Sequence, residues 1–80
     1  MTDAQNNELS PGDMVVLTEI PHGLLHGLPA EDQEAISKVV GKPILLNEYD
    51  ADGRAELKFT DSNGVIHFIC VKTSFIRAAK

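Results

Sequence analysis

Two turn dipeptides, Asp52-Gly53 and Asn63-Gly64, constrain the fold of this chain more than any other feature of its sequence. Both dipeptides tolerate the positive φ angles of tight hairpin turns, and strand-like sequence flanks each of them. They therefore predict a meander of three antiparallel strands over residues 44–71.

If both turns are two-residue loops, the pairing of the strands follows. Ala51 then faces Arg54, and Ser62 faces Val65. Side chains that face each other across strands share one face of the sheet. The face expected to form the core carries Ile44, Leu46, Ala55, Leu57, Phe59, Ile66, Phe68 and Cys70. The other face carries Leu45, Asn47, Tyr49, Glu56, Lys58, Thr60, His67, Ile69 and Val71. If Tyr49, Ile69 and Val71 stay exposed, the chain is expected to form a homo-oligomer.

Further elements are expected on both sides of the meander. Residues 14–20 are rich in Val, Leu and Ile and end at a proline, which predicts a buried first strand. Residues 29–40 predict a helix, because Pro29 suits its first position, acids follow in the first turn, and Gly41 can cap its end. A short turn and a brief closing strand are expected over residues 73–78.

The length of 80 residues allows one small domain. We expect it to span residues 10–80, after a flexible tail over residues 1–9 that shows no apolar periodicity. A chain this short buries only about 60% of its unfolded surface, which favours complexes with a partner.

The order of these elements resembles an SH3-like barrel over about residues 12–78. The sequence marks are Gly12-Asp13-Met14-Val15-Val16 and the two glycine turns. The resemblance implies a mainly β fold, a small five-stranded barrel with one short helix in the long loop after the first strand. Such elaborated barrels occur as accessory subunits of electron-transfer and hydratase complexes. The chain also resembles short uncharacterised bacterial proteins. The clustered aromatics with which SH3 domains bind polyproline are missing.

Charge and cysteine content restrict the partners and the compartment. The net charge of −5 repels polyanions, so nucleic acid is not an expected partner. Residues 1–37 hold seven acids and no Lys or Arg, so this half either complements the rest of the fold or presents an acidic face to a basic partner. The single Cys70 cannot form an internal disulfide, and neither a signal peptide nor a membrane span is evident. A cytoplasmic location away from membranes is expected.

Two sets of residues resemble metal sites, of which the zinc-like set is disfavoured and the calcium-like set is rejected. His22 and His26 lie four apart, and His67 and Cys70 lie three apart, as zinc ligands can. The first pair has glycines that disfavour a helix, and the second would point to opposite faces of a strand. Residues 48–53 resemble the start of a calcium loop, but its twelfth position holds Phe59.

No catalytic site is expected either. The predicted pairing buries Cys70 in the core, where a thiol is a poor nucleophile. His67 is expected to be a surface histidine beside Thr60. No phosphate-binding glycine loop, serine triad signature or dinucleotide fingerprint is present. We therefore expect no enzyme, no cofactor and no metal.

The apolar loop at residues 21–28 is the remaining candidate site. Its leucines either fold under the helix as part of the core or form an exposed contact patch. The second alternative predicts a small accessory module that binds a protein partner. Its partner-binding residues would be His22, Leu24, Leu25, His26 and Leu28.

Two other functions remain open. One is an RNA- or ribosome-associated barrel that uses the cations of the second half, Arg54, Lys58, Lys72 and Arg77. The other is a metal or thiol enzyme that uses the three histidines and Cys70.

Overall fold

A computed structural model of the chain describes residues 8–79. The elements, in chain order, are β1 (Met14–Leu17), α1 (Ala30–Val39), β2 (Pro43–Tyr49), β3 (Ala55–Thr60), β4 (Ile66–Val71), the 3-10 helix η1 (Thr73–Phe75) and β5 (Ile76–Ala78). The prediction of a mainly β fold with one helix is confirmed. Among the described residues, no helix is long and apolar enough to cross a membrane.

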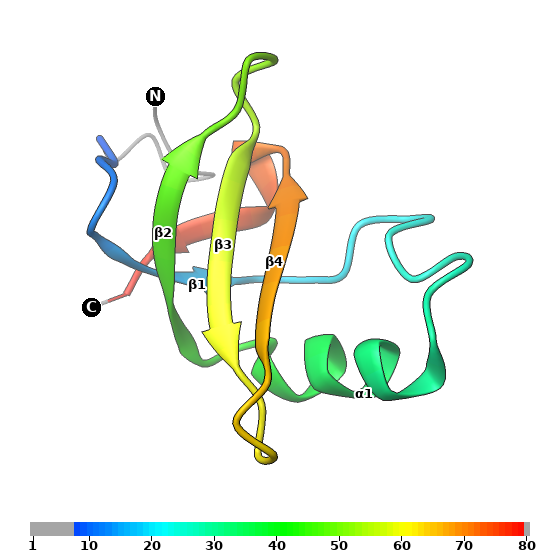
Figure 1. Ribbon diagram of the computed structural model, residues 1–80. Helices are drawn as coiled ribbons and strands as arrows, with labels where there is room; N and C mark the ends of the chain where they lie inside the picture. Colours follow the sequence, from blue (N-terminus) through cyan, green and yellow to red (C-terminus); the bar gives the residue numbers. More distant parts are fainter. Residues whose placement is uncertain (1–7, 80) are drawn as a thin grey trace.

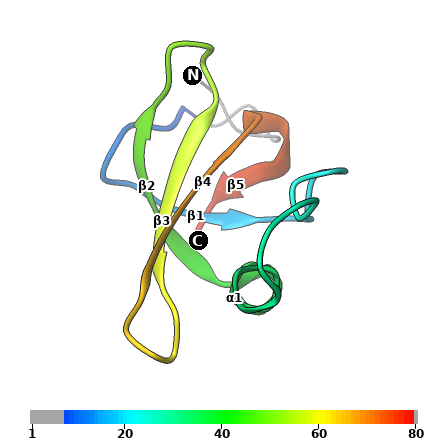
Figure 2. The ribbon, with the colours of Figure 1, turned by 45° about the vertical axis from the view of Figure 1, so that its right-hand side comes forward.

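The five strands form one antiparallel sheet in the order β4-β3-β2-β1-β5. In Figure 1, β2, β3 and β4 stand upright in front, β1 crosses behind them, and α1 lies below. Figure 2 shows the loop before α1 standing out to one side of the sheet. The end strands β4 and β5 do not pair with each other, so the sheet is open and a closed barrel is not confirmed.

Both hairpin loops contain three residues rather than the two expected. The N–H of Asp50 donates to the carbonyl of Arg54, and the N–H of Asp61 donates to that of Val65, each at 2.9 Å. The loops are thus residues 51–53 and 62–64, and each ends in a glycine with a φ of about +80°. A type I turn followed by such a glycine is a common hairpin connection. The predicted pairs Ala51/Arg54 and Ser62/Val65 are therefore wrong.

The longer loop reverses the face of β4. Because side chains alternate along a strand, a shift of one residue moves each side chain to the other face. Ile69 and Val71 lie in the core, whereas Ile66 and Phe68 are 52% and 56% exposed and Cys70 is half-buried. The prediction that Ile66, Phe68 and Cys70 belong to the core is wrong.

A bulge in β2 keeps the side chains of β3 and of the first part of β2 on the faces that the sequence predicts. The register shifts between Leu46 and Glu48, so Asn47 is an extra residue on this strand. Ile44 and Leu46 remain in the core, as predicted, and so do Ala55, Leu57 and Phe59 of β3. Beyond the bulge, Tyr49 turns toward the core instead of the outer face on which we expected it.

The core lies between the inner face of the sheet and α1. The helix contributes Ala35 and Ile36. Leu9 also belongs to the core with an exposed fraction of 3%, and the Tyr49 hydroxyl donates to its carbonyl at 2.9 Å. The expected tail over residues 1–9 is therefore wrong at Leu9, and residues 1–7 lie outside the described part of the chain.

Gly64→Ala is expected to destabilise the protein by about 1 to 2 kcal/mol, the cost of holding an L side chain in the left-handed region. Nothing lies within 4 Å of a Cβ placed on Gly64, so its φ of +81° is the whole reason. Urea denaturation measures the loss. Gly64→Asn is the control and should lose less, because Asn tolerates this conformation. Equal stability of Gly64→Ala and the original protein would contradict the three-residue loop.

Candidate functional site

The loop over residues 21–28 is a folded series of turns. The N–H groups of Leu24, His26 and Leu28 each donate to the carbonyl three residues earlier, at 3.1, 3.1 and 3.2 Å. Gly23 and Gly27 have φ values of +85° and +80° at the third position of the first and last of these turns. A positive φ there is typical of a type II turn, which favours glycine. The sequence His-Gly-Leu, present twice, thus gives the loop a defined shape.

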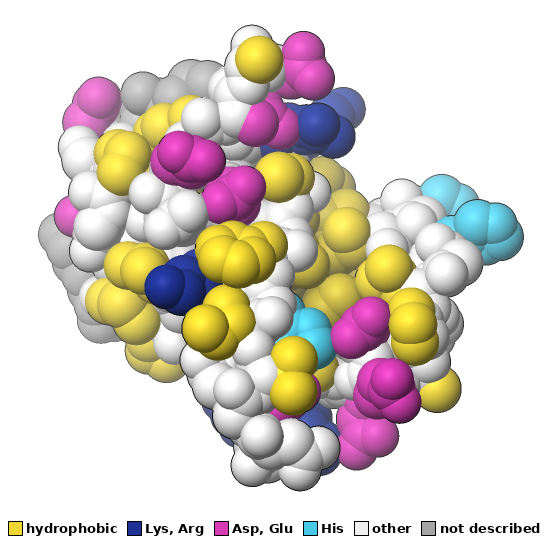
Figure 3. Space-filling view, in the orientation of Figure 1, with side chains coloured by type: hydrophobic (Ala, Val, Ile, Leu, Met, Phe, Trp, Pro, Cys, Tyr) yellow, Lys and Arg dark blue, Asp and Glu magenta, His cyan; other side chains and the backbone are white. Residues whose placement is uncertain are grey.

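The loop places its leucines and histidines differently. Leu24, Leu25 and Leu28 are half-buried and pack against the core. His22 and His26 are exposed, and Figure 3 shows histidine side chains at the outermost right-hand edge of the molecule. The leucines are therefore neither fully core nor a fully exposed contact patch, because each leucine contacts the core and keeps part of its surface in solvent.

A hollow separates this loop from the front of the sheet. Figure 3 shows it to the right of the strands, with hydrophobic side chains on its floor and acidic side chains below it. The strand of the sheet on the side of this loop is β4 (Figure 1), and three large apolar residues of β4 and its preceding turn are more than half exposed: Val65, Ile66 and Phe68. Exposed apolar groups that lie together on a small protein often mark a contact surface.

His67 lies on the inner face of β4, where it connects the sheet to α1. Its ring stacks on Phe59 with centroids 5.2 Å apart, and Nε2 lies 2.8 Å from Oδ2 of Asp61. Nδ1 lies 3.5 Å from Oδ1 of Asp32 on α1. The expected position on the surface beside Thr60 is thus wrong, since the register shift pairs His67 with Phe59. Both ring nitrogens of His67 therefore face carboxylates, so in either tautomer neither nitrogen is directed at a substrate.

Asp61 makes the stability of this region dependent on pH. Its hydrogen bond with His67, followed by the bonds from the N–H groups of Val65 and Asn63, lowers the pKa of Asp61 below its ordinary value of 3.8. A carboxyl whose pKa is lower in the folded state stabilises the fold above the ordinary value and loses that contribution as the pH falls through the folded one.

We therefore expect the free energy of unfolding to decrease as the pH falls below about 4. Asp61→Asn should flatten this decrease, because the amide does not titrate. Chemical denaturation between pH 5 and pH 2 compares the two proteins. An equally steep acid decrease in Asp61→Asn would contradict the assignment.

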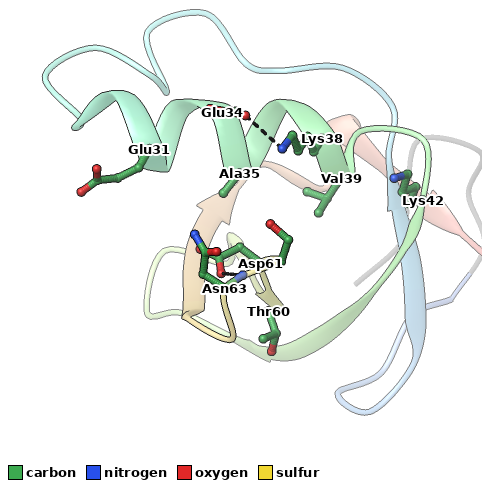
Figure 4. Close-up of a pocket in the computed structure, with 10 residues that line it drawn as sticks. Glu31, Glu34, Ala35, Lys38, Val39, Lys42, Thr60, Asp61 and Asn63 are labelled. Carbon is green, nitrogen blue, oxygen red and sulfur yellow. Dashed lines mark hydrogen bonds and ion pairs between the residues drawn. The ribbon is translucent and has the colours of Figure 1, made fainter.

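A cavity of about 350 Å³ lies between α1 and the β3–β4 turn. In Figure 4, Ala35 and Val39 of the helix face Thr60 and the turn across it. Of the charges at its edge, Lys38 contacts Glu34 at 2.9 Å, and the Asp61 carboxylate accepts bonds from the turn and lies against His67. Glu31 and Lys42 also lie at this edge, and the cavity can accept a small apolar group against Ala35 and Val39.

The residues considered for a metal or thiol site are not brought together. His22 and His26 lie on the exposed loop, His67 lies inside, and Cys70 is on the opposite face of β4. Within residues 8–79, no group of three or more His, Cys, Asp or Glu could hold a metal ion. Burial, followed by the charges of Asp50 and Glu56, raises the pKa of the Cys70 thiol, which disfavours the nucleophilic thiolate.

The cations considered for RNA binding are also separate. Arg54 and Lys72 line one shallow hollow, but Nε of Arg54 is 2.8 Å from Oδ2 of Asp50. Lys58 lies on the outer face with its Nζ 6.0 Å from the centre of the Phe68 ring, and Arg77 donates to the carbonyl of Ala78. These positions do not form a continuous basic surface on the described part of the chain.

Sequence reasoning found the loop but missed the exposed side chains of β4 and the bridge through His67. The overlooked signal for the first was the turn sequence Asp-x-x-Gly, which begins at Asp50 and again at Asp61. The bridge to Asp32 joins residues far apart in the chain, and no local pattern indicates it. No protein-family profile matches this chain, and searches of curated proteins and of solved structures also gave no match.

Proposed function

We propose that this chain is a small accessory module that binds another protein, and that the apolar loop 21–28 supplies part of the contact surface. The observation that carries the proposal is the ordered, half-buried state of its leucines beside an apolar hollow. Turn hydrogen bonds already hold the loop in one shape. Binding would therefore cost little conformational entropy.

Binding is better supported than catalysis because the reactive groups are occupied. Both nitrogens of His67 face carboxylates, and the Cys70 thiol has a raised pKa. His22 and His26 are exposed. Within residues 8–79, the side chain of neither histidine forms a hydrogen bond or an ion pair with an acid or base.

The charge near the loop indicates the chemistry of the partner. Glu31 and Asp32 occupy the first turn of α1, directly after the loop, and Glu19 precedes it. Lys and Arg are absent from residues 1–37. A partner with apolar side chains and neighbouring basic groups would complement this surface.

The arrangement also supports the proposal that the fold is SH3-like. The long connection after β1 holds the helix, β2 to β4 form a meander, and η1 precedes the last strand. This order agrees with the resemblance. The candidate loop lies in the long connection between β1 and α1.

Titration of a captured protein tests the proposed function. Candidates are first captured on the original protein, and each one is then purified and titrated against variants. Leu24→Asp/Leu25→Asp should weaken the affinity at least about tenfold, because charge would replace the apolar contact. Met14→Asp is the matched control, since Met14 is 46% exposed on another part of the surface, and it should bind normally.

A second loop variant removes the risk that the double leucine change unfolds the domain. His22→Lys/His26→Lys alters only exposed positions, so it should keep the circular dichroism spectrum and thermal transition of the original protein. Its affinity should fall as well, because the added positive charge repels the basic groups of the partner. Normal affinity of both loop variants would refute the loop as the contact surface.

A further inference from the structure

The outer edge of β4 has unpaired backbone groups. In an antiparallel pair, residues alternate between those that bond to the neighbouring strand and those that point away. The bond from Asp61 to the carbonyl of Val65 fixes this alternation, so His67, Ile69 and Val71 bond toward β3. The N–H and C=O groups that point away belong to Ile66, Phe68 and Cys70. Within residues 8–79, β4 pairs only with β3, and no other backbone bond involves these three residues.

The side chains of this strand do not protect its edge. Proteins commonly block an exposed strand edge with charged residues, proline or a bulge. β4 has the sequence Ile-His-Phe-Ile-Cys-Val, with no Lys, Arg, Asp, Glu or Pro, and its pairing with β3 is regular over all six residues. Ile66 and Phe68 are more than half exposed along it. The edge is therefore open to another strand.

The hollow described above lies beside this edge. Figure 3 shows it between the front of the sheet and the projecting loop, with hydrophobic side chains below the level of the strands. Loop 21–28 closes the far side, and α1 lies below it (Figure 1). Asp32 of this helix has a side chain that is 35% exposed and lies 3.5 Å from the His67 ring.

We propose that the partner inserts an extended peptide segment into this hollow, where it pairs with the edge of β4 as an additional strand. This inference rests on the proposed function and names its ligand chemistry. The backbone of Ile66, Phe68 and Cys70 supplies the hydrogen bonds. Alternate apolar side chains of the peptide fill the hollow against the leucine loop, and a Lys or Arg meets the acids at the start of α1.

An extended segment fits these observations better than other occupants. A helix satisfies its own backbone and would leave the β4 groups unpaired. A second copy of this chain would carry its own projecting loop beside β4, in the space that the first loop already borders (Figure 2). A polyproline segment lacks the N–H groups that the carbonyls of the edge require.

Selection from a phage-displayed library of random ten-residue peptides, with the full chain as target, tests the inference. Enriched peptides should alternate apolar residues, contain Lys or Arg, and lack proline in their centre. In the complex, hydrogen exchange should slow at the amides of Ile66, Phe68 and Cys70. Failure to enrich any peptide, or enriched peptides that leave these three amides unchanged, would overturn it.

Two matched pairs then separate backbone pairing from side-chain contact. N-methylation of alternate residues in a selected peptide removes hydrogen-bond donors. Methylation of the positions that face the β4 edge should weaken binding at least about tenfold, whereas methylation of the other positions should weaken it little. In the protein, Ile66→Pro removes an outward N–H and should weaken binding similarly, whereas Ile66→Ala keeps that N–H and should lose less. Equal binding by both methylated peptides would refute strand pairing.

The outcome also distinguishes the two proposals. Peptides that are lost with Leu24→Asp/Leu25→Asp but leave the β4 amides unprotected would support a loop-binding module and refute strand addition. Peptides that protect the β4 amides in both the original protein and the loop variant would support strand addition and refute the role of the loop.

Discussion

Phe59→Ala is expected to destabilise the protein by about 3 to 5 kcal/mol, whereas Phe68→Ala should change its stability by less than about 1 kcal/mol. Phe59 on β3 is 6% exposed and stacks on His67. Its removal leaves a cavity and takes away one contact that holds the bridge to α1. Phe68 on the neighbouring strand is 56% exposed, and its contact with Lys58 is at the surface.

Urea denaturation of the two variants measures this difference, and each serves as the control for the other because the amino-acid change is the same. The two-residue turns expected from the dipeptides would place both rings in the core and give two large losses. Similar losses for Phe59→Ala and Phe68→Ala would therefore contradict the register described here.

The sequence predicted the elements well and the register poorly. The helix, the meander and the closing strand follow from local patterns that the structure confirms. The register depends on the length of each turn, and the dipeptides Asp52-Gly53 and Asn63-Gly64 fit loops of two or three residues. Asp50 and Asp61 decide between these lengths: the Oδ1 atom of each accepts backbone N–H bonds within its loop. Asp at the first and Gly at the fourth position favour a type I turn, and this signal could have been used.

Other features depended on contacts that no local pattern shows. His67 reaches Asp32 across the interior, and Asn47 forms a bulge only because β2 and β3 pair on both sides of it. The candidate loop was identified from its composition. Whether its leucines were buried depended on how the loop packs on the core, and the structure gives an intermediate state.

The register also changes the view of function. With two-residue turns, β4 would bury Phe68 and expose Ile69, and the apolar loop would stand alone as a candidate surface. The observed register instead leaves Ile66 and Phe68 exposed on β4, the edge strand on the side of the projecting loop (Figure 1). Two apolar surfaces from distant parts of the sequence thus adjoin one site, which supports a binding role more strongly than either does alone.

Leu9→Ala is expected to destabilise the protein by about 2 to 5 kcal/mol, although Leu9 lies near the start of the described chain. Its side chain is 3% exposed within the core cluster, and its carbonyl accepts a hydrogen bond from the Tyr49 hydroxyl. Burial, followed by the charges of Glu8 and Asp13, raises the pKa of Tyr49, so the hydroxyl stays protonated and keeps donating over the neutral range.

Tyr49→Phe is the companion variant, because it removes the hydroxyl and keeps the ring. It should lose about 0.5 to 1.5 kcal/mol, the usual contribution of one hydrogen bond. Urea denaturation at neutral pH measures both losses. A tail that merely lies on the surface would give changes below about 0.5 kcal/mol in Leu9→Ala. A large loss would instead show that the folded domain begins before residue 10, and that any shortened form used for binding studies must retain Leu9.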